Sequence, residues 1–357
     1  MLIAAFLIPW DMQAAAGPWE AANQQTRHYV AEVMQSRRIP GLQIAVVKNG
    51  RVVMSESHGL ANVENAIPAT PATRFPLNSA SKSFTGVAVM QLVQAGKVSL
   101  DAPISRYLDD LPEPWNAVRV QQLLAHTSGL PDIVDAQGLV GGGSEQTAWD
   151  AVTRLPTEAA PGERFAYNQT NYLLLSRIIA ARSGMPYADY IATRQFNVVG
   201  MPQALFGDSY DLVANAATLY SYFPRRTDPG DSAPRLSHWF YDMTPGLWAG
   251  GGVQTTATEV AQWLAALDNG SLLDPTLVRQ MWQPATLDDG SDAAWGAGWQ
   301  VTQEGKERRV AAMGGARAAF IVYPDRQLAV VVLTNLVGAN PQEFIPAIAA
   351  FYGPSRP

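Results

Sequence analysis

The two ends of the chain carry hydrophobic patterns that are typical of β-strands. Leu42–Lys48 and Arg51–Ser55 are rich in apolar residues and flank Asn49-Gly50, a strong sequence signal for a tight hairpin turn. Near the other end, Ala318–Tyr323 and Leu328–Thr334 are β-branched and aromatic runs separated by a short proline-containing turn. We therefore expect strand material at both ends of the sequence.

Helical patterns dominate the sequence between these ends. Apolar residues recur at helical spacing in Trp19–Arg37, Ser79–Ala95 and Tyr172–Ala181, and a last helix is expected over about Pro341–Phe351. The simplest architecture is an α/β (α+β) fold. One antiparallel sheet is built from both termini and flanked by helices, and a mostly helical subdomain is inserted into it.

The length of 357 residues suits either about two domains or one large domain with an insertion. We expect one domain over residues 17–357, with an α/β part at about 17–75 and 290–357 and a helical part at about 76–289. Residues 1–16 resemble a signal-peptide remnant, because a short apolar run precedes Ala14-Ala15-Ala16. This predicts a periplasmic or secreted protein, with a cytoplasmic location as the alternative. No other stretch is apolar enough to anchor the chain stably in a membrane.

The composition limits the kinds of catalytic group and binding partner that the chain can have. Apolar residues make up 47% and charged residues 16% of the chain, as in an ordinary folded protein. The net charge of −6 argues against a nucleic-acid partner. The chain has no cysteine, and its four histidines lack metal-ligand spacing, so we expect neither a metal nor another cofactor. Hydroxyl and amine groups remain as candidate catalysts.

Two short motifs hold such groups. Ser79 begins a predicted helix, and Lys82 follows on the same helix face. A serine hydroxyl needs a base to become a nucleophile, and a lysine is a base only where its pKa falls below the usual value of about 10.4. Tyr167, at the start of another predicted helix, can move protons beside a cation such as Lys82. Taken alone, these residues also fit a capping serine, a solvated lysine and a packing tyrosine.

The order and spacing of further motifs resemble the serine β-lactamase-like superfamily. The pattern is closest to the class C β-lactamase-related branch, with its family VIII carboxylesterases and D-aminopeptidase-like serine hydrolases. The matching segments span almost the whole chain after its N-terminal region. They are Phe75–Gly86, Gly96–Asp101, Leu123–Pro131, Pro161–Tyr167, Ala249–Gly252 with Thr255–Ala257, and Val331–Asn335.

The resemblance implies a fold and a reaction. The fold is that of β-lactamases and penicillin-binding proteins. Ser79 would attack an ester or amide carbonyl of a small-molecule ester, amide or peptide and form an acyl-enzyme, with Lys82 and Tyr167 as general base and acid. The backbone N–H of Ser79 and one near Gly315, which follows Gly314 on the facing strand, would form the oxyanion hole.

Two departures from the family pattern bear on the substrate. Gln169 stands where the second motif usually has Asn, so the amide is kept but its reach differs. The third motif usually starts with Lys or His, whereas the best alignment here gives Ala312-Met313-Gly314. This loss argues against efficient β-lactam hydrolysis, and Arg317 is a candidate clamp for a substrate carboxylate, or else pairs with a nearby acidic residue.

The alternatives to an esterase or amidase remain open at this point. They are a peptidase for short or D-residue-containing peptides, a weak β-lactamase, and a catalytically silent binding protein. His126 invites comparison with a Ser–His–Asp triad. Its segment matches a family turn, however, which favours a structural role.

Overall fold

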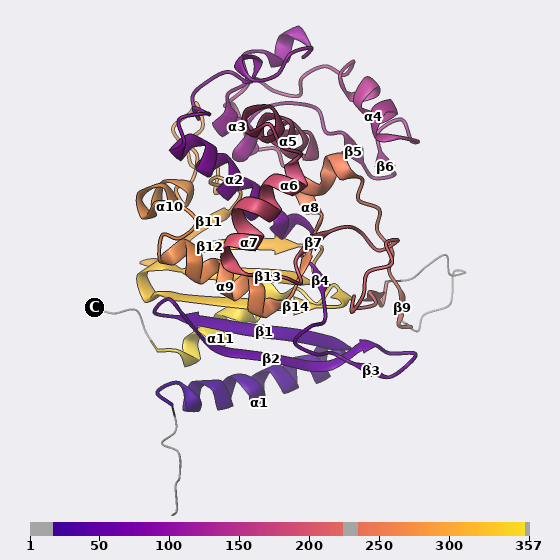
Figure 1. Cartoon of the computed structure of the whole chain (residues 1–357), viewed down its shortest axis with the longest axis vertical. Coiled ribbons are helices and arrows are strands. Elements are labelled where there is room, and N and C mark those ends of the chain that lie inside the picture. The colour runs from indigo at the N-terminus through magenta and orange to yellow at the C-terminus, as the bar shows by residue number, and fades with distance from the viewer. Residues whose placement is uncertain (1–16, 224–234, 354–357) are drawn as a thin grey trace, which may run out of the picture.

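A large antiparallel sheet forms the centre of the molecule. The computed structural model describes residues 17–223 and 235–353, so the leader expected over residues 1–16 lies outside the described part. The sheet has seven strands in the order β11-β12-β13-β14-β1-β2-β3 (Figure 1). These strands are β1 (Gly41–Lys48), β2 (Arg51–Asn62), β3 (Ile67–Pro68), β11 (Gln300–Glu304), β12 (Glu307–Gly314), β13 (Ala318–Tyr323) and β14 (Leu328–Thr334).

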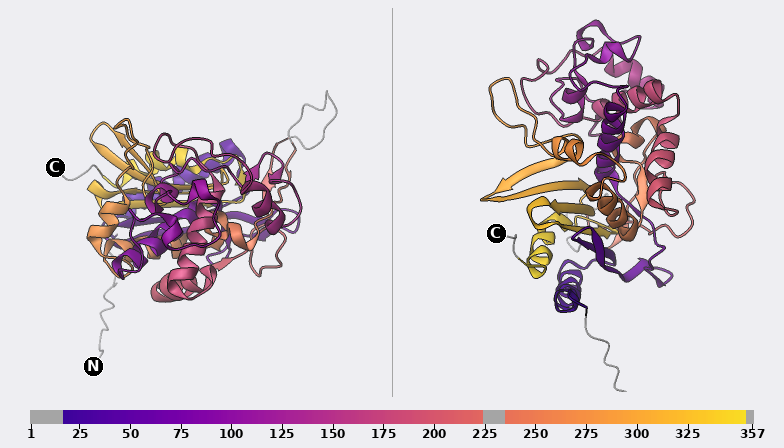
Figure 2. Two further views of the ribbon diagram at one scale, coloured as in Figure 1. Left: turned by 90° about the horizontal axis from the view of Figure 1, so that it is seen from above. Right: turned by 60° about the vertical axis from the view of Figure 1, so that its left-hand side comes forward.

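The two ends of the chain meet in the middle of this sheet. Strands β1 and β14 pair antiparallel from Leu42 opposite Thr334 to Lys48 opposite Leu328. The predicted sheet from both termini is therefore confirmed. The β11–β12 hairpin projects from its edge (Figure 2).

The central strands are buried on both faces. Along β14, Val330 and Val332 face a core that includes α1 (Glu20–Arg37) and α11 (Ile345–Phe351). Their neighbours Ala329, Val331 and Leu333 alternate with them and face the larger core with α9 and the helical part. This alternation follows from the two-residue period of a strand. Figure 1 shows α1 below the sheet and the helical part above it.

The helical part surrounds α2 (Lys82–Gln94), which has ten buried residues and packs against α5 (Gln169–Ser183). The expected helix over Ser79–Ala95 starts differently, because a 3₁₀ turn, η1 (Asn78–Ser81), precedes α2. The other helices are α3 (Val120–Leu124), α4 (Glu145–Val152), α6 (Tyr187–Ile191), α7 (Asn197–Val199), α8 (Trp248–Gly251), α9 (Ala257–Asp268) and α10 (Pro275–Met281). Short strands complete the fold: β4 (Phe75–Pro76), β5 (Val134–Asp135), β6 (Gly138–Leu139), β7 (Leu205–Phe206), β8 (Tyr220–Ser221), β9 (Ser237–His238), β10 (Val253–Thr255) and β15 (Leu336–Val337).

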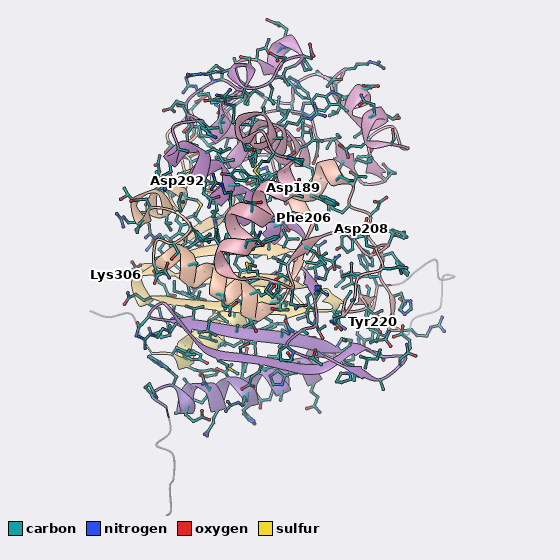
Figure 3. The ribbon with its side chains drawn as sticks, in the orientation of Figure 1. Asp189, Phe206, Asp208, Tyr220, Asp292 and Lys306 are labelled. Atoms are coloured by element: carbon teal, nitrogen blue, oxygen red, sulfur yellow. The ribbon has the colours of Figure 1, made fainter. Side chains whose placement is uncertain are left out.

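Two labelled side chains locate the β11–β12 turn and the short strand β8 in the molecule. Figure 3 shows Lys306, in the β11–β12 turn, at one end of the view and Tyr220 at the other. No helix in the described ranges combines the length and hydropathy needed to cross a lipid bilayer.

Candidate active site

The turn that carries Ser79 is held from both sides. Ser81 Oγ accepts a hydrogen bond from Val253 N at 3.1 Å, which ties the turn to β10. Ser83 Oγ donates to Ala80 O at 2.7 Å, which links α2 back to the turn. Ser79 itself is only half-buried, whereas its neighbours Ala80 and Ser81 are fully buried. The nucleophile candidate is thus a partly accessible group on a fixed support.

Lys82 lies directly behind this turn and is fully buried. Its Nζ donates to Gln169 Oε1 at 3.0 Å and to Gly250 O at 2.8 Å. The rings of Tyr167 and Tyr172 have their centroids 4.7 and 5.0 Å from the same nitrogen. Neutral oxygens and aromatic faces surround the amine, and no carboxylate in the described part of the chain lies within 4.0 Å of it.

Position 250 requires a glycine because Lys82 Nζ and the Gln169 side-chain amide leave no room for a side chain. A Cβ at this position would collide with Gln169 Oε1 and lie 3.3 Å from Lys82 Nζ. Gln169 is the first residue of α5, and its N–H donates to Asp132 Oδ1 at 2.9 Å. The longer side chain that departs from the family pattern therefore still brings its amide oxygen to Lys82.

Asn168 fixes the directions of its two neighbours, Tyr167 and Gln169. Its side-chain oxygen accepts from Asn171 N at 2.9 Å and caps α5, while its own N–H donates to His126 Nδ1 at 3.2 Å. The His126 ring lies 4.4 Å from the Tyr167 ring, tilted by 34°. Tyr167 is 39% exposed, so its ring packs on His126 while part of the side chain stays accessible.

His126 is buried and has no carboxylate partner in the described ranges. Burial and the nearby Lys82 hold the pKa of His126 well below its ordinary value. Nδ1 accepts the Asn168 N–H, so the ring in this arrangement is neutral. The geometry is that of a supporting group under Tyr167.

The end of the strand opposite Ser79 consists of glycines. A Cβ on Gly314, at the end of β12, would overlap the Leu77 carbonyl and lie 2.7 Å from Ser79 N and 2.8 Å from Ala80 N. Gly315 follows with a φ of +56°, a conformation that disfavours side chains. Gly314 therefore lies in close contact with the backbone of the Ser79 turn.

Arg317 lies beneath this strand end and is 2% exposed. Its Nε donates to Asn78 Oδ1 at 2.9 Å, and its Cζ lies 5.1 Å from the centre of the Tyr241 ring. No acidic side chain in residues 17–223 and 235–353 forms an ion pair with it. Ala312 is buried in β12 opposite Phe320 on β13, and it supplies no charge to the site.

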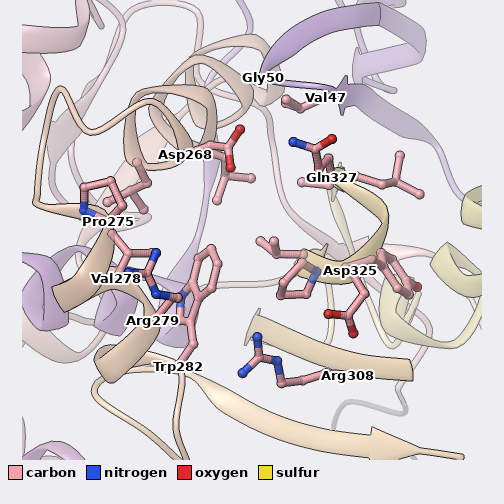
Figure 4. Close-up of a pocket in the computed structure, with 17 residues that line it drawn as sticks. Val47, Gly50, Asp268, Pro275, Val278, Arg279, Trp282, Arg308, Asp325 and Gln327 are labelled. Carbon is pink, nitrogen blue, oxygen red and sulfur yellow. The ribbon is translucent and has the colours of Figure 1, made fainter. Parts of the chain in front are cut away.

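A different cavity, of about 340 Å³, opens between α9, α10 and the sheet (Figure 4). Trp282, Arg279, Arg308, Asp268 and Asp325 are among the residues that line it, whereas Ser79 and Lys82 are not. It has no arrangement of nucleophile and base. In the described part of the chain, no group of three or more His, Asp or Glu side chains is placed to hold a metal ion.

The family of the chain follows from a comparison with known families. A profile described as Beta-lactamase matches residues 26–351. The chain belongs to the beta-lactamase family. The resemblance of its sequence motifs to the family is confirmed.

Individual relatives of this family member are distant. Protein flp of Staphylococcus aureus strain N315 is 25% identical over 340 residues, which cover 92% of this chain and 65% of that protein. The chain thus spans about two thirds of the length of this relative. An octameric penicillin-binding protein homologue from Pyrococcus abyssi has a similar structure, with a TM-score of 0.75, 28% identity, and coverage of 92% of this chain and 77% of that one.

A further neighbour supports the fold alone. D-amino acid amidase from Ochrobactrum anthropi SV3 has a TM-score of 0.74 at 23% identity, covering 93% of this chain and 97% of that one. The expected fold of β-lactamases and penicillin-binding proteins is confirmed by these structures.

The structure brings several of the predicted site residues together and adds others that were not predicted. Lys82, Tyr167 and Gln169 meet around one amine, and Gly314 reaches the Ser79 turn. The Lys82 contact made by Gly250 was not predicted, although its Gly-rich segment matched a family motif. Asp132 also gave no functional signal in the sequence, and Asn78 lay within a matched family motif without a role of its own.

Proposed function

We propose that the chain hydrolyses esters or amides through an acyl-enzyme on Ser79. The observation that carries this proposal is the environment of Lys82. A neutral amine can give its two N–H groups to Gln169 Oε1 and Gly250 O and keep its lone pair for a proton. An amine held by two neutral acceptors, one helical turn from a half-exposed serine, is arranged as a base.

The reaction would proceed in two steps. In the first, Lys82 or Tyr167 removes the Ser79 hydroxyl proton, Ser79 Oγ bonds to the carbonyl carbon, and the leaving group departs with the proton. In the second, water attacks the acyl-enzyme, its proton goes to the same pair of residues, and Ser79 recovers its hydrogen as the acid is released. The carbonyl oxygen becomes negative in both steps, beside the N–H groups of Ser79 and Gly315.

Neutral esters are the preferred substrate class in this proposal. Without a Lys or His at Ala312, the site has lost the third-motif cation that helps relatives hold the carboxylate of a β-lactam. A lost charge-assisted hydrogen bond of this kind costs about 1.5–3 kcal/mol. Amides and short peptides use the same acyl chemistry and are the second class to test. A binding protein without activity would have no need of a base held behind an accessible serine.

The test compares the wild type with Ser79→Ala on p-nitrophenyl esters, short peptide amides and nitrocefin. Turnover of at least one ester that disappears in Ser79→Ala is the expected result. Ser36→Ala is the matched control, because Ser36 is exposed on α1, where its Oγ donates to Val33 O of the same helix. A fluorophosphonate probe should label Ser79 in the wild type. Turnover that survives in Ser79→Ala, or its absence on all three substrate classes, would overturn the proposal.

A further inference from the structure

Arg317 makes a hydrogen bond that its expected role, binding a substrate carboxylate, does not explain. The guanidinium is 2% exposed, which leaves little surface for a substrate. Its Nε donates to Asn78 Oδ1 at 2.9 Å across 239 residues of sequence. Asn78 directly precedes Ser79, and Arg317 comes two residues after Gly315. One hydrogen bond therefore joins the segments that would supply both oxyanion donors.

Asn78 is under conformational constraint at this contact. Its φ is +47°, in the left-handed region that non-glycine residues rarely adopt. A Cβ on Gly315 would lie 2.8 Å from Asn78 Oδ1 and 3.2 Å from Arg317 Cζ. The Asn78 amide is thus enclosed between the nucleophile turn and the strand end. Such a residue keeps its conformation only where its surroundings fix it.

The charge of Arg317 adds a second effect. Burial lowers the pKa of Arg317 to about 10, so the group stays cationic at neutral pH. It has no ion-pair partner among the described residues and faces the Tyr241 ring. A cation in a site of restricted solvent access favours negative charge nearby.

We propose that Arg317 is a positioning residue that holds the Ser79 turn against the Gly314-Gly315 strand end through Asn78 and so sets the width of the oxyanion hole. This inference rests on the proposed function. It also supplies a positive charge close to Gly315 in a site that lacks the third-motif cation. The residue acts on kcat for every substrate and does not select those that carry a carboxylate.

The experiment is a double-mutant cycle with Arg317→Met and Asn78→Gly. Glycine keeps the left-handed backbone of Asn78 available while it removes the amide. Each single variant should lower kcat on a neutral p-nitrophenyl ester by about 10- to 100-fold, with KM within about threefold. The kcat of the double variant should lie within about threefold of the kcat of the less active single variant, because both changes break the same hydrogen bond.

Control measurements separate a positioning effect of Arg317 on kcat from loss of folded protein and from binding of a substrate carboxylate by Arg317. Arg309→Met removes an arginine of β12 that pairs with Glu304 and Glu307, and it should leave kcat unchanged. Active-site titration counts competent molecules, so a structural defect lowers the titre while a misplaced oxyanion hole lowers the rate per site. A p-nitrophenyl ester with a free carboxylate is measured in parallel.

Three results would overturn the inference: an unchanged kcat in Arg317→Met, additive losses in the cycle, or an effect confined to KM for the carboxylate-bearing ester. Ser79→Ala is measured in the same series. If it retains turnover, the proposed function itself fails. If it is inactive while Arg317→Met is unaffected, only the positioning role fails.

Discussion

Gly314→Ala offers a direct measure of how closely the sheet approaches the nucleophile. The added Cβ would overlap the Leu77 carbonyl and lie 2.7 Å from Ser79 N. To reach an ordinary contact distance, Ser79 N must move away by about 0.7 Å. This displacement separates the two proposed oxyanion donors without removing any polar group.

The expected loss follows from that distance. A shift of about 1 Å in a reacting geometry costs about 10²-fold in rate, and removal of an oxyanion donor costs about 10²- to 10³-fold. We therefore expect kcat of Gly314→Ala to fall about 100-fold, which corresponds to about 2.7 kcal/mol of transition-state stabilisation. Overpacking should also lower the free energy of unfolding by about 1–3 kcal/mol.

The assay is steady-state and burst kinetics on a p-nitrophenyl ester at 25 °C, with urea unfolding to check that the variant is folded. Gly305→Ala is the matched control, because no atom lies within 4 Å of its added Cβ and its turn is at the far end of the same hairpin, beside Lys306 (Figure 3). Its kcat should stay within about twofold of wild type, with only the modest strain of its positive φ. A folded Gly314→Ala variant with kcat within about threefold of wild type would refute the oxyanion-hole assignment.

Three other outcomes are expected. Gln169→Asn restores the family residue but shortens the side chain that reaches Lys82 Nζ, so kcat/KM for esters should fall about 10-fold or more. An increase in kcat/KM would show that the hydrogen bond between Lys82 and Gln169 does not support the reaction. His126 stays neutral in the folded state while an unfolded histidine takes a proton below about pH 6.5, so this residue stabilises the fold above that pH and the contribution is lost on acidification. Urea titrations should show about 1 kcal/mol less of this contribution at pH 5.5 than at pH 7.5, and a His126→Asn variant with the same pH dependence as wild type would contradict it. Nitrocefin turnover should be at least about 10-fold below that of the best neutral ester, and Ala312→Lys should narrow the gap if the missing cation is its cause.

The predicted fold succeeded where the pattern is local. The β-branched runs Ala318–Tyr323 and Leu328–Thr334 coincide with β13 and β14, and the helix over Trp19–Arg37 is α1 within a residue. The hydrophobic pattern did not predict the β11–β12 hairpin, although the family resemblance implied a strand ending at Gly314, because Glu307–Gly314 opens with charged residues and its outer neighbour Gln300–Glu304 is mostly polar. An edge hairpin with exposed residues lacks the apolar alternation that marks a central strand.

The candidate site was indicated by the sequence only through its side-chain chemistry. Ser79, Lys82 and Tyr167 have distinctive residue types at recurring spacings, so a sequence can indicate them. Gly250 contributes a backbone carbonyl, which every residue possesses, so its residue type gives no sign of that role. Arg317 donates its hydrogen bond to Asn78, 239 residues away, and a local sequence pattern cannot indicate a contact between residues so far apart in the chain.

This separation along the chain has a consequence for when activity can begin. The Ser79 turn leaves the ribosome long before the Gly314-Gly315 strand end, and Asn78 and Arg317 are 239 residues apart. At about 5–20 residues per second, synthesis of that interval takes roughly 12–48 s. During this time α2 can form, but β1 still lacks β14 and the nucleophile lacks its opposing strand. Under the proposed function, the nascent chain therefore forms no acyl-enzyme on Ser79 until its last sheet strands have been made.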